Sequence, residues 1–380
     1  MDRRNLLVGM VATQFRFAAG FLGLTFLGPD AALASSGGAG IAQCAGLDEG
    51  GTAPASRLRR QRIKDGLRRG FGVQYWGDSF TVTDLAAAPH GLLIIETAKA
   101  GASETTPEVF FSADEIRQIG RNGARPVLGY LNLAKVEPYR DYWVAATARN
   151  GAPLTPEDAP WIGPSLGLDG TLARYWTPQW HKIVEDRVDR LMALHVDGIF
   201  LDDVLQYYTF ARAVALGAPD FKGTDDPRSG EAFAQAMMEL VTVAVRRARQ
   251  HDCNALIVVN NGVYIGRDAG TGPVADSLPA TFDTYRDDID GILIESLFAQ
   301  GGDTGAISVL HEDFASEDIP VLAIDFADTE TLPGETTDAM KATVAKRAAA
   351  EGFAAYVADD ALFNRLYAPV PLEQTDPPSP

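Results

Sequence analysis

The sequence predicts a single (β/α)8 barrel, a TIM barrel, because short apolar segments alternate with amphipathic ones along most of the chain. Two of the apolar segments also repeat one short pattern, and each repeat ends in a carboxylate. The rival architecture, a doubly wound open sheet, would require a glycine-rich phosphate loop after the first strand, and Tyr75–Asp78 is not one. The predicted strands are Phe71–Trp76, Gly91–Thr97, Pro126–Leu133, Gly198–Asp202, Ala255–Asn260, Gly291–Glu295, Pro320–Asp325 and Phe353–Val357.

Amphipathic stretches between these segments predict the helices of the barrel. The pair Thr177 and Pro178 is a typical helix start, with threonine as the N-cap and proline in the first turn. The main predicted helices are Ser112–Arg121, Pro178–Leu194, Gly230–Gln250 and Thr337–Glu351.

The composition fits a globular protein that binds neither nucleic acid nor an anionic membrane. The chain has 380 residues, 46% of them hydrophobic, and its formal net charge is −18 from 33 basic and 51 acidic side chains. Such an excess of acidic residues repels polyanions. It is compatible with a neutral or cationic substrate, and equally with a solvated acidic surface on an exported protein. We expect a monomer without a stable membrane span.

The amino terminus predicts export. Residues 1–34 combine a basic start, a largely apolar middle and a small-residue cleavage site before Ser35, which is typical of a signal peptide. We therefore expect a periplasmic or secreted protein, with a flexible linker over residues 35–68, the barrel over residues 69–369 and a disordered tail over residues 370–380. Whether the two cysteines, Cys44 and Cys253, form a disulfide stays open at this point.

The repeated pattern supplies the candidate catalytic residues. Val196–Leu201 and Ile289–Ile294 each contain an Asp-Gly turn and a bulky apolar run, and the next residues are Asp202 and Glu295. Carboxyl ends of barrel strands form the mouth where active sites are built. Alternation points both carboxylates inward from the fourth and sixth strands, whose backbones lie roughly 10 Å apart. We predict Glu295 as the proton donor and Asp202 as the nucleophile or base, with retaining and inverting geometries both open.

Further polar and aromatic residues are expected to bind the substrate. Several lie at or near strand ends, where amides, phenols and carboxylates suit sugar hydroxyls and amines, and four of the five tryptophans follow the third strand. Trp180, at the start of a helix, is instead expected in the core. The predicted substrate-binding residues are Tyr75, Tyr130, Asn132, Glu137, Arg140, Trp176, Asp203, Asn260, Asp325 and Tyr356.

The segment Val127–Trp143 resembles the third-strand signature of the endo-α-1,4-polygalactosaminidases, glycoside hydrolase family 114. Tyr175–Trp180, Asn260–Gly262 and Asp290–Glu295 resemble later blocks of that family, so the resemblance covers about Gly70 to Tyr367. It implies a TIM barrel that cleaves an α-linked amino-sugar polysaccharide, with Asp202 and Glu295 as its catalytic carboxylates. The chain departs from the family at Ala134-Lys135, where Gly-Glu is usual, and this exchanges a carboxylate for a cation near the cleft.

Other chemistries have less support in the sequence. None of the five histidines ends a strand or has metal-ligand spacing, so we expect neither a metal nor a cofactor. A magnesium site made by Asp202, Asp203 and Glu295 stays open. The alternative function is a polysaccharide-binding barrel without turnover.

Overall fold

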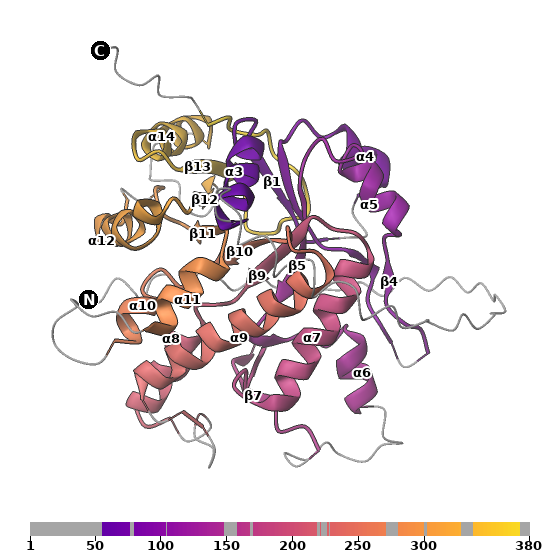
Figure 1. Ribbon diagram of the computed structural model, residues 1–380, viewed down its shortest axis with the longest axis vertical. Coiled ribbons are helices and arrows are strands. Elements are labelled where there is room, and N and C mark those ends of the chain that lie inside the picture. The colour runs from indigo at the N-terminus through magenta and orange to yellow at the C-terminus, as the bar shows by residue number, and fades with distance from the viewer. Residues whose placement is uncertain are drawn as a thin grey trace.

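The computed structural model describes residues 55–76, 80–103, 105–147, 158–167, 170–218, 221, 226–227, 229–270, 280–299, 302–327 and 337–372. Its centre is one sheet of eight parallel strands that pair in chain order, which confirms the predicted TIM barrel (Figure 1). The strands are β1 (Phe71–Gln74), β2 (Leu92–Ile95), β5 (Val127–Asn132), β9 (Gly198–Asp202), β10 (Leu256–Asn260), β11 (Gly291–Glu295), β12 (Val321–Phe326) and β13 (Ala354–Ala358). All eight predicted strands are confirmed, with ends that differ by at most a few residues.

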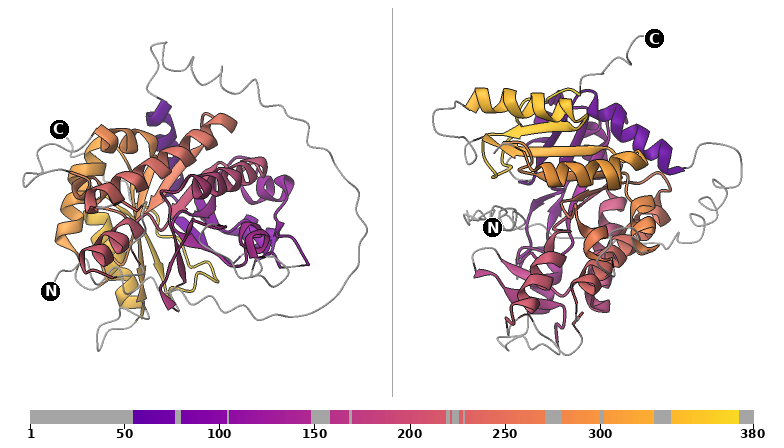
Figure 2. Two further views of the ribbon diagram at one scale, coloured as in Figure 1. Left: turned by 90° about the horizontal axis from the view of Figure 1, so that it is seen from below. Right: turned by 90° about the vertical axis from the view of Figure 1, so that its left-hand side faces the viewer.

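Helices surround this sheet on its outer side (Figure 2). Thr177 caps α7 as predicted, since its side chain accepts a hydrogen bond from the Trp180 amide. The longer helices are α3 (Ala55–Leu67), α7 (Pro178–Ala193), α8 (Gln206–Ala215), α9 (Gly230–His251), α11 (Ala280–Asp288) and α14 (Thr337–Ala350). The shorter ones are α4 (Val82–Ala87), α5 (Ala113–Ile119), α6 (Asp141–Thr147), α10 (Ile265–Asp268) and α12 (Thr304–Val309). Within the described ranges, no helix is both long and apolar enough to cross a membrane.

Two small antiparallel sheets lie outside the barrel. One contains β3 (Ala98–Ala100) and β4 (Val109–Phe110), and the other contains β6 (Lys135–Val136), β8 (Thr171–Ala173) and β7 (Ile162–Ser165) in that order. The second sheet belongs to the long connection between β5 and α7, so it stands directly beyond the carboxyl end of the third barrel strand.

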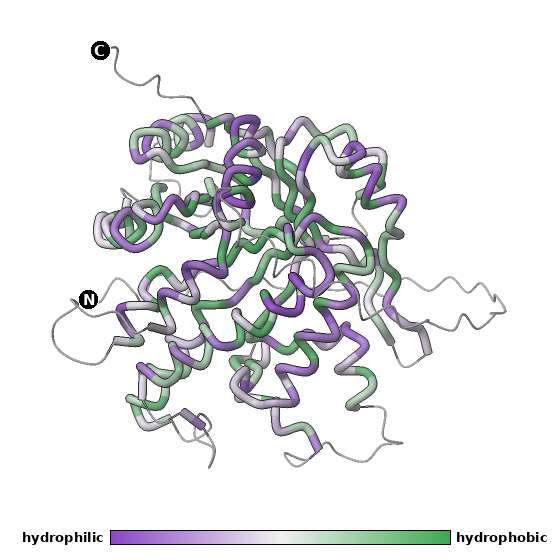
Figure 3. The backbone as a smooth tube through the Cα atoms, viewed as in Figure 1, coloured by the Kyte–Doolittle hydropathy of each residue, from purple (hydrophilic) through white to green (hydrophobic). Residues whose placement is uncertain are grey.

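The barrel strands separate two apolar clusters. In Figure 3 these strands form the hydrophobic centre of the molecule. Along β9, Phe200 belongs to the cluster inside the barrel, whereas Ile199 and Leu201 belong to the cluster under the helices. Because strand side chains alternate, Asp202 also points inward, and the same alternation points Glu295 inward from β11. The predicted inward direction of both carboxylates therefore agrees with the packing.

Helix α3 closes the amino-terminal end of the barrel, where a flexible linker over residues 35–68 was expected. Ile63 and Leu67 are fully buried and belong to the inner cluster. The helix lies so close to the start of β2 that a Cβ atom on Gly91 would stand 2.1 Å from the Gly66 carbonyl oxygen. The linker prediction is therefore wrong for Ala55–Leu67, because Ile63 and Leu67 are buried in the barrel end and Arg59 and Arg60 reach partners there.

The two Asp-Gly repeats bind this helix. Asp290 pairs with Arg59 at 2.9 Å and accepts a hydrogen bond from the Ile257 amide. Asp197 likewise pairs with Arg62 and accepts from the amide at the start of β5. Each repeat therefore has one carboxylate that anchors α3 below the barrel and one, Asp202 or Glu295, at the opposite mouth.

The carboxyl-terminal segment fills the seam between β1 and β13, which are the two ends of the hydrogen-bonded strand order. The Tyr75 amide donates to the Phe363 carbonyl, the Tyr367 amide donates to the Tyr356 hydroxyl, and the Leu372 amide donates to Leu67. Val370 packs against the core and Leu372 is hydrogen-bonded to α3, so the predicted tail over residues 370–380 begins a few residues too early. Residues 373–380, like the signal over residues 1–34, lie outside the described residues. Cys253 is in a disulfide, and Cys44 lies outside the described residues.

Candidate active site

Asp202 and Glu295 meet at the mouth of the barrel through Asn260. The three residues end β9, β11 and the intervening β10. The Asn260 side-chain amide donates to Asp202 Oδ1 at 2.7 Å and to Glu295 Oε1 at 2.8 Å, so these two oxygens lie at most 5.5 Å apart, the sum of the two distances. The amide nitrogen faces both groups, because a flipped carbonyl would face the ionised Asp202 carboxylate. The predicted pair is therefore brought together.

The two carboxyl groups differ in their hydrogen-bond donors. Asp202 accepts from Asn260, from the Asp203 amide at 2.6 Å and from the Tyr130 hydroxyl at 2.7 Å. For the Glu295 side chain, Asn260 is the only donor among the described residues. Because donors favour an ionised carboxylate, Asp202 is the better stabilised anion of the two.

Burial and mutual repulsion shift the acidity of both groups. Burial, with the nearby charge of Asp202, raises the pKa of Glu295 to about 7. Burial and the charge of Asp203 also raise the pKa of Asp202, but hydrogen bonds from Asn260 and Tyr130 oppose that rise. Near neutral pH the arrangement therefore favours a protonated Glu295 beside an ionised Asp202, as an acid and nucleophile pair requires.

Asn132 fixes the direction of the hydrogen bond to Asp202. Its amide nitrogen donates to the Tyr130 hydroxyl at 3.1 Å and to Asp203 at 2.5 Å, and its oxygen accepts from the Lys135 amide at 2.7 Å. Since the Tyr130 hydroxyl oxygen already accepts a hydrogen bond from Asn132, the hydroxyl donates its own hydrogen bond to Asp202. The third and fourth strands are thus joined by a directed chain of side chains.

The backbone turns sharply after each functional strand. Asp203, Asn261 and Ser296 directly follow β9, β10 and β11, and their φ angles are 62°, 61° and 57°. This left-handed conformation is uncommon for residues other than glycine and costs free energy, so such residues cluster at functional sites. Asn261 also accepts a hydrogen bond from the Glu295 amide at 3.2 Å, which holds the end of β11 against β10.

A family model described as glycoside-hydrolase family GH114 matches residues 103–371. The chain belongs to this family. An uncharacterised protein of Methanocaldococcus jannaschii is 22% identical over 285 residues, 73% of this chain and 72% of that protein. Membership of the GH114 family makes this chain a glycoside hydrolase, and its substrate is a glycan.

Two solved structures share the fold. Ega3 of Aspergillus fumigatus, solved in complex with galactosamine, has a TM-score of 0.53 and 14% identity, with 80% of this chain and 96% of that chain covered. The glycoside hydrolase domain of PelA from Pseudomonas aeruginosa has a TM-score of 0.50 and 15% identity, with 79% and 98% covered. At these identities the likeness shows the barrel fold.

Tyr75 lies beside the catalytic pair. Its ring centroid is 4.6 Å from that of Tyr130 and 4.5 Å from that of Phe363. Burial and the negative charges of Asp202 and Glu295 raise the pKa of its hydroxyl well above the usual range. The hydroxyl is therefore neutral and close to both carboxylates, and it is buried without a hydrogen-bond partner among the described residues.

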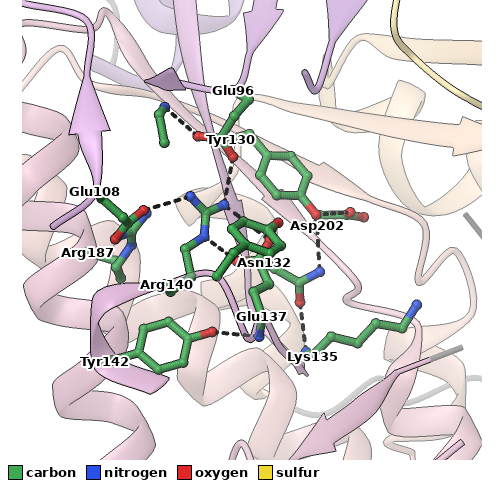
Figure 4. A network of polar contacts seen from close by, with 12 residues as sticks. Glu96, Glu108, Tyr130, Asn132, Lys135, Glu137, Arg140, Tyr142, Arg187 and Asp202 are labelled. Carbon is green, nitrogen blue, oxygen red and sulfur yellow. Dashed lines mark hydrogen bonds and ion pairs between the residues drawn. The ribbon is translucent and has the colours of Figure 1, made fainter. Parts of the chain in front are cut away.

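Glu137 and Arg140 belong to a buried ion cluster next to this site (Figure 4). Arg140 is 1% exposed and pairs with Glu96 at 2.6 Å, with Glu137 at 2.8 Å and with Glu108 at 3.2 Å. Glu108 also pairs with Arg187 of α7. Because the guanidinium donors of Arg140 pair with carboxylates inside the protein, Arg140 holds the loop before α6 in place. None of the contacts of Arg140 in the described residues points to the expected role in substrate binding.

Three other predicted substrate-binding residues make their contacts inside the protein, with Asp325 and Tyr356 fully buried and Trp176 partly buried. Trp176 packs on Phe210 and Phe233 at 4.9 and 5.3 Å, beneath α8 and α9. Asp325 has no exposed surface and accepts hydrogen bonds from two amides of the loop after β11. Tyr356 is likewise fully buried. Asp325 and Tyr356 therefore offer no surface to a glycan and instead support packing and loop position, whereas Trp176 keeps part of its surface exposed. Trp180 is 1% exposed, which agrees with its predicted place in the core.

Glu96 and Gln206 contact the site residues but are not among those predicted from the sequence. Glu96 follows β2 directly, so the signal that selected Asp202, a carboxylate at a strand end, was present. Gln206 donates to Asp203 at 2.9 Å and carries no such signal. Within the described part of the chain, no group of three or more histidine, cysteine or acidic side chains is placed to hold a metal ion.

Proposed function

We propose that the protein is a retaining glycoside hydrolase that cleaves an α-linked amino-sugar polysaccharide. The observation that carries the proposal is the single Asn260 amide that donates to both carboxyl groups. The two hydrogen bonds limit the distance between the bonded oxygens of Asp202 and Glu295. This distance fits the carboxyl separation of about 5–5.5 Å in retaining enzymes and is shorter than the separation of about 6.5–9.5 Å in inverting enzymes.

In the proposed first step, Asp202 attacks the anomeric carbon while Glu295 gives its proton to the glycosidic oxygen. The bond to the leaving sugar breaks and a glycosyl–Asp202 ester forms. In the second step, Glu295 takes a proton from water, whose oxygen attacks the anomeric carbon and releases Asp202. Tyr130 and the Asp203 amide stabilise the Asp202 carboxylate before attack and after release.

The amino-sugar part of the proposal has separate support. Ega3 shares this fold and was solved with galactosamine. Asp202, Asp203 and Lys135 also give the mouth charged groups of both signs, which suits a glycan that carries amino or acetamido groups. We further propose that the protein is exported, because its first residues have the pattern of a signal peptide.

The test is the release of reducing ends from α-1,4-linked galactosaminan of several degrees of acetylation. Glu295→Gln and Asp202→Asn should each lower turnover by about 10³-fold or more, while the exposed control Asp186→Asn should not. Proton NMR at early times should detect the α-anomer first. A first product with the β-configuration would contradict retention, and a protein that holds the polymer without releasing reducing ends would be a binding barrel.

A further inference from the structure

Lys135 brings a positive charge to the mouth of the barrel. It lies on β6, directly beyond β5, and its side chain is 18% exposed. Its ammonium nitrogen is 3.5 Å from Asp203 Oδ1. Burial alone would lower the pKa of Lys135, but the charges of Asp203 and Asp202 outweigh that effect and raise it. The side chain therefore stays charged and faces the catalytic carboxylates.

The base of this side chain is fixed, whereas its charged end keeps hydrogen-bonding capacity. The Lys135 backbone amide donates to Asn132, which anchors the residue to the third strand. Asp203 takes shorter hydrogen bonds from Asn132 and Gln206, at 2.5 and 2.9 Å, than its contact with the lysine. An ammonium has three donors, and Asp203 is its only ion-pair partner in the described ranges, so donors are left for a ligand.

A charged neighbour of the nucleophile affects which amino sugars suit the site. With Glu295 protonated, Asp202 and Asp203 contribute two negative charges, and Lys135 cancels one of them. A sugar with a free ammonium is then attracted less and also meets a like charge. An acetamido carbonyl or a hydroxyl can instead accept a hydrogen bond from the lysine.

We propose that Lys135 is a specificity-determining residue, which favours N-acetylated sugars over sugars with a free ammonium at the subsite beside Asp202 and Asp203. This inference rests on the proposed function, because it concerns the amino-sugar substrate of the same site. Lys135 acts on the substrate by charge and hydrogen bonding, and it transfers no proton in the reaction.

The test compares kcat/KM for matched acetylated and deacetylated α-1,4-galactosaminan oligosaccharides. Lys135→Gln keeps the length and a donor but removes the charge, and it should shift the ratio about tenfold toward the deacetylated substrate. Lys135→Glu should shift it further. Lys182→Gln removes the same charge from the exposed face of α7 and should leave the ratio unchanged. The shift should shrink in 1 M salt, where the Debye length is about 3 Å.

A binding experiment separates this inference from the proposed function. In the Glu295→Gln background, calorimetry measures the affinities of galactosamine and N-acetylgalactosamine with and without Lys135→Gln. A change in their ratio supports the role of Lys135 even if no polymer is cleaved, whereas absence of cleavage by the unmodified protein counts against the proposed function. A ratio that stays the same in folded Lys135→Gln protein, in both experiments, overturns the inference.

Discussion

The hydrogen bond from Tyr130 to Asp202 gives the sharpest test of the active site. Tyr130→Phe removes one of three donors to the carboxylate and leaves the Asn132 amide without one acceptor. A hydrogen bond to a charged group contributes about 1.5–3 kcal/mol, so kcat/KM should fall roughly 10- to 100-fold. Because this bond lowers the pKa of Asp202, its loss should raise that pKa by about one unit or more.

The assay is the pH dependence of kcat/KM on a neutral, acetylated oligosaccharide between about pH 4 and 9. In the unmodified protein the rate should fall above about pH 7, where Glu295 loses its proton. Tyr130→Phe should move the acidic limb upward, since ionised Asp202 then requires a higher pH, and should leave the basic limb near its place. Tyr285→Phe is the matched control, because that buried hydroxyl has no partner among the described residues. An unchanged acidic limb in folded Tyr130→Phe protein would refute the reasoning.

Three further predictions concern stability and metal dependence. Because the pKa of Glu295 is raised in the folded state, its contribution to stability is present below pH 4.5 and is lost as the pH rises toward 7. Glu295→Gln should therefore raise the free energy of unfolding at pH 8 by up to about 3 kcal/mol and change it little at pH 4. Gly91→Ala crowds the α3 backbone, so it should lower the free energy of unfolding by about 2 kcal/mol or more and lower the urea midpoint. Gly230→Ala is the control, because the nearest atom to its added Cβ lies 3.8 Å away. Equal midpoints for the two variants would argue against tight docking of α3. A chelator should leave turnover unchanged, and activity restored only by magnesium would instead favour the carboxylate metal site.

The sequence by itself determined the barrel strands and the two inward carboxylates. Buried parallel strands need continuous apolar runs, and their carboxyl ends carry polar residues at the mouth of the barrel. Both features can therefore be recognised in a short segment of sequence. Alternation along each strand then settles which side chains point inward. Asp202, Glu295 and Asn260 follow from this pattern without knowledge of their contacts.

Tertiary structure decided which polar residues join the site and which support it. Arg140 and Asp325 look like binding residues in the sequence, but Glu96 and Glu108, which pair with Arg140, and the amides that bind Asp325 come from segments that only folding brings close. The same holds for α3, whose arginines find Asp197 and Asp290 more than a hundred residues away. Sequence patterns report the local preference for burial or exposure, whereas the partner of a buried charge depends on packing between elements, which no single segment encodes.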